Sequence, residues 1–268
     1  MSFIFYVLLT GIVGVLFFLV SLLGRQRRRQ REFGFQLLQA LRMLVKHIQV
    51  HRGFTALYIS GNADISEQLN LEANAINNDI DIISGLSPNL VENEDWRGIT
   101  QHWARLSARN IRFEKYDYYE QHCKLVASCL TLMRSIAFEH NIHHNFRPND
   151  DIFWYELLQL GEMLGQLRAL GTMHLCNSTN AEERRKRVTR IRLCTGEIEA
   201  AYVNSELRER IGKHQCDEIN HFLAIVEHYI INNKAWITSD RYFSIATETM
   251  EIIYTNFDEE MQNLLKQI

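Results

Sequence analysis

The sequence is poor in residues that interrupt helices and carries little net charge of either sign. Its 268 residues include only 2 prolines and 13 glycines, few for a chain rich in strands and turns. The net charge of −3 provides no overall basic surface, which argues against a nucleic-acid partner. Its 5 cysteines are scattered without C-x-x-C spacing, which argues against a disulfide framework or a zinc knuckle. We expect reduced, buried thiols.

The sequence also lacks the motifs of common catalytic sites. It has no glycine-rich phosphate loop, no serine–histidine–aspartate context and no cysteine–histidine pairing that stands out. His47 and His51 are one helical turn apart, the spacing of paired metal ligands. No Glu-x-x-His pair, however, recurs on separate helices as a di-iron site requires. We therefore predict no enzyme, no metal site and no cofactor.

A long uncharged apolar stretch is present at the N-terminus. It runs from Phe3 to Leu23, and about 20 such residues at a rise of roughly 1.5 Å span the hydrocarbon core. Arginines crowd residues 25–31, where a cleaved signal peptide would have small residues. The positive-inside rule predicts a single-pass anchor in the inner membrane, in contact with lipid, with the C-terminal domain in the cytoplasm. An inverted anchor with a periplasmic domain is the alternative.

Apolar residues at a spacing of three to four predict helices through the rest of the chain, and no alternation of period two predicts a strand. The expected helices cover residues 32–59, 64–84, 92–110, 115–141, 150–175, 181–211, 215–232 and 239–268. The predicted fold class is all-α, an N-terminal transmembrane helix followed by two packed four-helix bundles, about eight helices. The expected parts are an anchor (1–24), a basic juxtamembrane segment (25–35) and a helical domain (36–268) with pseudo-repeat halves of about 36–145 and 150–268.

Two arginines stand inside otherwise apolar helical segments. Arg52 lies in the stretch His51–Asn62, and Arg168 lies in Gly165–Gly171, each about ten residues before an asparagine-bearing break. A cation on the inward side of a helix is costly unless something negative meets it. Two such arginines in matching contexts therefore indicate a shared anion.

A guanidinium group is a rigid planar fork of donors that suits planar oxyanions such as nitrate and nitrite. Thr55, Thr172 and the backbone amides near Gly53 and Gly171 could add neutral donors to such a site. The alternative is that the arginines form structural salt bridges, for example with Glu162 or Glu156.

The residues His51–Gly61 resemble the opening motif of the nitrate- and nitrite-sensing domain family, in which Arg-Gly is followed by Ser or Thr and later by Gly. The segment Gly165–Gly171 resembles the second arginine segment of that family. Ser239–Thr247 resembles its last helix, where an aromatic pair precedes a threonine. The resemblance implies two four-helix bundles that bind nitrate or nitrite between helices, with anion-binding arginines at Arg52 and Arg168.

Domains of this family usually precede an output module, and none follows in this chain. We therefore expect signalling through a separate, unidentified partner. The hypothesis is a membrane-anchored sensor or binding module for nitrate or nitrite. The alternative is a ligand-free helical interaction or scaffold protein tethered to a membrane, with both arginines salt-bridged. A metalloenzyme comes third, and a homodimer is kept open.

Overall fold

The computed structural model describes residues 2–59, 61–108, 115–142, 153–176, 181–203, 206–234 and 236–266. Side chains are described for the same residues except 2–13, 15, 115–116, 202–203 and 206. Within this part the chain is helical and contains no strand, which confirms the all-helical prediction. The helices are α1 (Ser2–Ile59), α2 (Ser66–Leu86), α3 (Pro88–Val91), α4 (Glu94–Ala108), α5 (Lys115–Glu139), α6 (Phe153–Leu175), α7 (Ala181–Val203), α8 (Glu206–Ile211), α9 (Lys213–Ile225) and α10 (Ser239–Lys266), with a 3-10 turn at Ala63–Ile65 and a π-helical turn at Val226–Ile231.

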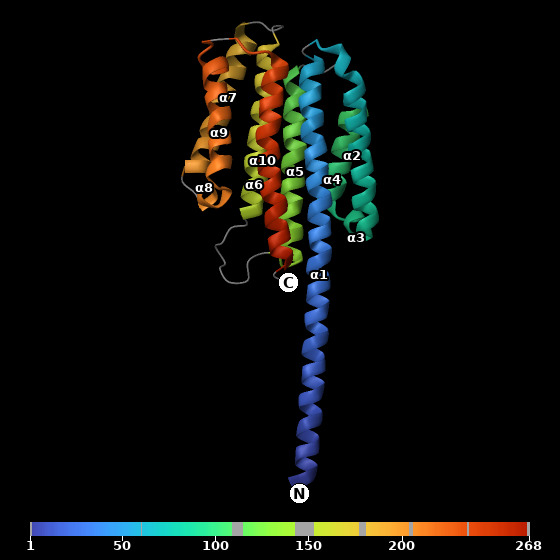
Figure 1. Ribbon diagram of the computed structural model, residues 1–268. Helices are drawn as coiled ribbons and strands as arrows, with labels where there is room; N and C mark the ends of the chain where they lie inside the picture. Colours follow the sequence, from blue (N-terminus) through green and yellow to red (C-terminus); the bar gives the residue numbers. More distant parts are fainter. Residues whose placement is uncertain are drawn as a thin grey trace.

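The long helices run side by side in an elongated body (Figure 1). Helices α1, α5, α6 and α10 lie in the middle, with α2 to α4 on one flank and α7 to α9 on the other. Helix α1 packs on α2 and α5, α6 packs on α7 and α10, and α1 contacts α6. The expected boundary between halves, residues 145–150, lies outside the described residues, so it stays a prediction.

Short polar and glycine-containing segments end the helices where the sequence predicts breaks. Gly61 has a φ of +107°, and the amides of Gly61 and Asn62 donate to the carbonyls of Tyr58 and Leu57. This is the left-handed glycine cap that satisfies the last carbonyls of a helix. The side chain of Asn93 accepts a hydrogen bond from the amide of Trp96 at 3.1 Å and caps the first turn of α4.

One predicted helix is interrupted. The expected single helix over residues 181–211 ends at Val203, and α8 begins at Glu206. Leu207 and Ile211 of α8 are buried, where α8 contacts α6 and α9. The break thus places two apolar side chains in the core, an arrangement that the charged sequence of α7 does not reveal.

Helix α6 lies at the centre of the packing. Of its 23 residues, 17 are buried, so it presents no solvent face of the usual width. Arg168 and Glu162 are therefore buried by the position of their helix, not by a local pocket in the surface.

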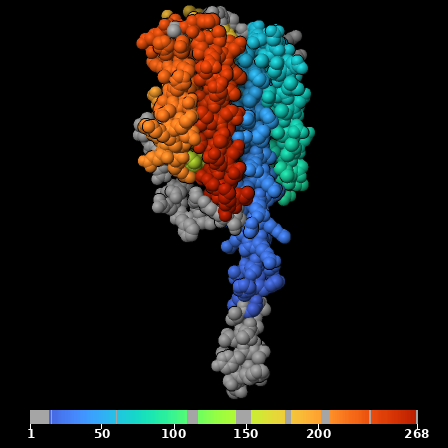
Figure 2. All heavy atoms as spheres, viewed as in Figure 1, coloured from blue at the N-terminus to red at the C-terminus, as the bar shows by residue number. Residues whose placement is uncertain are grey.

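The N-terminal part of α1 projects from the body as a narrow stalk (Figure 2). No described helix is long and apolar enough to cross a membrane. The side chains of residues 2–13 and 15 lie outside the described set. This finding contradicts the predicted transmembrane anchor at 1–24 and the predicted inner-membrane location.

All five cysteines are described, and none forms a disulfide. Cys129, Cys194 and Cys216 are buried, and Cys123 and Cys176 are partly buried. Burial raises the pKa of the Cys123 thiol to about 11, so the thiolate is scarce at neutral pH.

The close packing of α6 against α10 depends on Gly171. A Cβ at this position would overlap the ring of Tyr242, which is fully buried and donates to the carbonyl of Leu167 at 2.8 Å. We expect Gly171→Ala to lower the free energy of unfolding by about 1–3 kcal/mol, measured by urea denaturation. Gly161→Ala is the matched control, because a Cβ there meets its nearest atom at 3.5 Å. It should stabilise the helix by up to about 1 kcal/mol, and equal effects of both variants would contradict the packing argument.

Candidate functional site

Arg52 of α1 and Arg168 of α6 lie where the two central helices contact each other, and each is only 1% exposed. Their guanidinium groups are near enough that the charge of Arg52 helps to lower the pKa of Arg168. The structure therefore brings together the two arginines that the sequence analysis paired.

Two glycines make this approach sterically feasible. A Cβ on Gly53 of α1 would lie 2.7 Å from the Phe243 ring and 3.4 Å from Nε of Arg168. A Cβ on Gly165 of α6 would lie 2.7 Å from Nη2 of Arg52. Each helix thus leaves room, by a glycine, for the arginine of the other helix. Gly53 is therefore part of the site as a spacer, and a donor role for the backbone near it stays a prediction.

Arg52 is neutralised by Glu162. Its Nη1 and Nη2 donate to Oε1 and Oε2 of Glu162 at 2.6 and 3.1 Å, a bidentate pair. The carboxylate also accepts from the amides of Gln49 at 2.8 Å and Gln166 at 3.0 Å. Burial alone would lower the pKa of Arg52, but the Glu162 carboxylate, with smaller contributions from Cys123 and Tyr119, raises it overall. The salt bridge kept as an alternative from the sequence is therefore present at one arginine.

Arg168 has no such partner. Its Nη1 donates to the Thr247 hydroxyl at 3.1 Å, and its Nη2 donates to the carbonyl of Gln49 at 2.8 Å. The guanidinium carbon lies 4.8 Å from the centre of the Phe243 ring, a cation–π contact. No described carboxylate lies within ion-pair distance of Arg168, and its buried Nε has no hydrogen-bond partner. The cation is solvated by neutral groups only.

The balance of charge in this cluster is one net positive charge, from two guanidinium groups and the single carboxylate of Glu162. Burial, and then the charge of Arg52, lower the pKa of Arg168 to about 10. Arg168 consequently stays protonated at neutral pH while buried. The Nε of Arg52 is also buried without a partner, so each arginine retains one unused donor. Such an arrangement can accept one small anion.

The helix segment Ser239–Thr247, singled out in the sequence, contributes to this cluster through Phe243 and Thr247. Phe243 also stacks on Phe54, two residues after Arg52 in α1, with ring centres 5.9 Å apart. The sequence analysis missed Gln49 and Gln166. Gln49 lies three residues before Arg52, hence on the same face of α1, which is the signal that could have identified it.

The two threonines expected as donors bond elsewhere. The Thr55 hydroxyl donates to the carbonyl of His51 at 2.7 Å, and the Thr172 hydroxyl donates to the carbonyl of Arg168 at 2.7 Å. Both are bonds within one helix turn, a common arrangement for buried threonine. A ligand role for Thr55 and Thr172 stays a prediction, and it would require these hydroxyls to rotate.

His47 and His51 do not converge on one site. His47 pairs with Asp79 of α2 at 2.6 Å, whereas Nδ1 of His51 lies 2.8 Å from Nε2 of His122 on α5. Nδ1 of His122 donates to the carbonyl of Tyr118 at 2.7 Å, so Nδ1 of His51 is the donor to His122 when both rings are neutral. Among the described residues, no group of three or more potential ligands could hold a metal ion.

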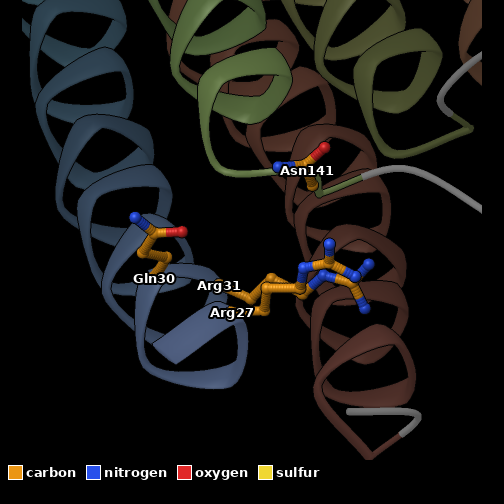
Figure 3. A pocket seen from close by; sticks show the side chains of 4 residues that line it. All are labelled: Arg27, Gln30, Arg31 and Asn141. Carbon is orange, nitrogen blue, oxygen red and sulfur yellow. The ribbon is translucent and has the colours of Figure 1, made fainter. Parts of the chain in front are cut away.

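A second polar feature lies at the base of the body. A pocket of about 380 Å³ is lined by Arg27, Gln30, Arg31 and Asn141, and both arginines extend from α1 in the same direction (Figure 3). Arg31 and Arg52 are 21 residues apart on one helix, or roughly 30 Å at 1.5 Å per residue. This pocket is therefore separate from the arginine pair.

Comparison with solved structures shows a similar fold in one known protein. Among solved structures, the chain is similar to the NasR transcription antiterminator, with a TM-score of 0.66 and 17% sequence identity. The likeness covers 95% of this chain and 74% of that chain. At this identity it shows a shared helical fold. No family model and no curated protein matches the chain, so membership in the nitrate- and nitrite-sensing family stays a prediction.

The buried histidine pair predicts a pH dependence of stability. Burial lowers the pKa of His51 to about 4 and places that of His122 well below its usual value of 6.5. Below pH 6.5 the unfolded chain binds protons that the folded chain does not, so these histidines reduce stability as the pH falls toward 4. We expect the free energy of unfolding of the double variant His51→Phe, His122→Gln to decline less over this range than that of the wild type.

His47 serves as the control with the opposite sign. The hydrogen bond to Asp79 raises the pKa of His47 above 6.5 despite partial burial. Its contribution is therefore present below pH 6.5 and lost as the pH rises through the folded-state pKa. Denaturation of His47→Gln across pH 4 to 9 should show its deficit against the wild type shrinking at high pH. A deficit of the same size at every pH would contradict the assignment.

Proposed function

We propose that this chain is a sensing module for nitrate or nitrite, which holds the anion between α1 and α6. The observation that carries the proposal is Arg168, a fully buried cation with no carboxylate partner and an unused Nε donor. Leaving such a charge unpaired is costly, and a bound monoanion would remove the cost. The role is binding and signalling, without catalysis.

The chemistry of the site favours a small planar ion. Arg52 and Arg168 each offer one unused Nε–H, and both lie between closely packed helices spaced by Gly53 and Gly165. A planar anion of three or four atoms can enter with a small displacement, and a bulkier ion requires a larger one. Nitrate and nitrite are also more weakly hydrated than phosphate, so the cost of removing their water is lower.

Binding at this place has a mechanical consequence. Without an anion, the two guanidinium groups repel each other across the contact of α1 and α6. A bound anion offsets that repulsion and also needs room between the helices, so binding changes how α1 and α6 pack, a two-state change of the kind used in signalling. Since α1 continues without a break from Arg52 to the projecting stalk, a shift of α1 can be passed to a separate partner there.

Two further lines support the proposal. The segments around Arg52, Arg168 and Thr247 are those that resemble the nitrate- and nitrite-sensing family, and the structure gathers all three at one place. The fold is shared with a transcription antiterminator, a regulatory protein.

The second candidate function is a ligand-free helical interaction or scaffold protein. The observation that favours it is the complete neutralisation of Arg52 by Glu162, with both arginines enclosed by protein atoms. On this view Arg168 is held by Thr247, Phe243 and the Gln49 carbonyl for stability alone.

Thermal unfolding in nitrate distinguishes the two functions. At a nitrate concentration of about 100 times Kd, binding stabilises the native state by about 2.7 kcal/mol, or roughly 5–10 °C for a chain of this size. The same concentration of chloride should produce a much smaller shift. Arg168→Met should abolish the nitrate shift with little loss of stability in anion-free buffer, because it removes an uncompensated buried charge.

Arg42→Met is the matched control. Arg42 lies on the same helix and is ion-paired with Asp258 at 2.8 Å, away from Arg168. This variant should lose some stability and keep the full nitrate shift. No shift of the wild type in tens of millimolar nitrate or nitrite would reject the sensing function and leave the scaffold function.

A further inference from the structure

We infer that Glu162 restricts the anion site to singly charged ions. This inference rests on the proposed function and adds a specificity determinant to it. Glu162 is 7% exposed and lies on α6, where its carboxylate contacts Arg52 and Gln49 of α1.

The carboxylate of Glu162 is fixed in place. Oε1 accepts from Arg52 and Gln166, and Oε2 accepts from Arg52 and Gln49, so both oxygens have two donors. A group held by four hydrogen bonds from two helices does not leave when an ion enters. Its negative charge is therefore a permanent part of the site.

The fixed charge sets which ions the cluster can balance. Arg52, Arg168 and Glu162 together carry one net positive charge. A monoanion brings the buried cluster to neutrality, whereas a dianion such as sulfate leaves one buried negative charge without compensation. Burial of an unpaired charge is costly, so the dianion is rejected.

Neighbouring carboxylates do not alter this balance. Glu251 of α10 is exposed and is ion-paired with Lys46 at 2.8 Å. Glu72 of α2 is partly buried, and burial raises its pKa against the charges of His47 and Lys46 beside it and of Arg168. Neither carboxylate forms an ion pair with Arg52 or Arg168, so among the described residues Glu162 is the carboxylate in direct contact with the arginine pair.

The test compares sodium nitrate and sodium sulfate, at matched ionic strength, as ligands of the full chain by calorimetry and thermal shift. Wild-type protein should bind nitrate and bind sulfate at least about tenfold more weakly. Glu162→Gln keeps the shape of the side chain and raises the site to two positive charges. Its preference for nitrate over sulfate should fall by about tenfold or more, or reverse.

Asp258→Asn is the matched control, since it also removes the carboxylate partner of an arginine on α1. It should leave the ratio of nitrate to sulfate affinity unchanged. Nitrate binding by the wild type together with an unaltered ratio in Glu162→Gln would overturn the inference and leave the proposed function intact. Failure of wild-type protein to bind any of these anions overturns both.

A second variant decides the matter if Glu162→Gln does not fold. The Thr247 hydroxyl of α10 accepts from Nη1 of Arg168 at 3.1 Å, so Thr247→Asp gives Arg168 a carboxylate partner and brings the cluster to zero net charge while Arg52 stays paired with Glu162. It should weaken nitrate binding by about tenfold or more. Thr247→Asn, which is similar in shape and uncharged, should weaken it much less. Equal nitrate affinity in the two Thr247 variants would overturn the inference.

Discussion

The structure depends on how a single unpaired cation is tolerated at the contact of its two central helices. Arg168 sits on α6, a helix that is buried on nearly all sides, so its guanidinium group cannot reach water. The fold offers it a carbonyl, a hydroxyl and an aromatic ring, which solvate the charge without cancelling it. Each of these partners belongs to α1 or α10. The position of the two helices against α6 is consequently tied to the charge of one side chain.

Packing and electrostatics oppose each other at this contact. Gly53 and Gly165 bring the helices close, which favours dispersion contacts and the exclusion of water. The same closeness sets two guanidinium groups in a medium where charges are poorly screened, and it lowers the pKa of Arg168. Glu162 neutralises the charge of Arg52 and leaves the charge of Arg168 uncompensated. A small anion bound at this one place would compensate it, and the contact between α1 and α6 would then depend on the ligand.

Helical periodicity and break residues predicted most of the fold, including the ends of the helices near Gly61 and Leu175. The prediction of the fold was wrong where it rested on the composition of one segment without its packing against the rest of the chain. The apolar N-terminal run predicted a membrane span, but the described part of α1 holds no such span. The division of residues 181–211 at Val203 follows from burial of Leu207 and Ile211, a tertiary effect. For the site, the sequence predicted the arginine pair. It could not predict that Glu162 pairs with Arg52 while Arg168 has no carboxylate partner among the described residues, because this depends on how α1 and α6 are rotated about their axes. Periodicity fixes a face of a helix and leaves its contacts open.

The asymmetry between the two arginines bears on what the site is for. A purely structural pair of buried arginines would be expected to carry two carboxylates, because each unpaired buried charge lowers stability. The chain instead gives its one carboxylate four hydrogen bonds and gives Arg168 only a hydroxyl, a backbone carbonyl and an aromatic ring. These neutral partners leave the cluster one negative charge short. A site that lacks one charge, and retains an unused donor on each arginine, is suited to receive that charge from solution.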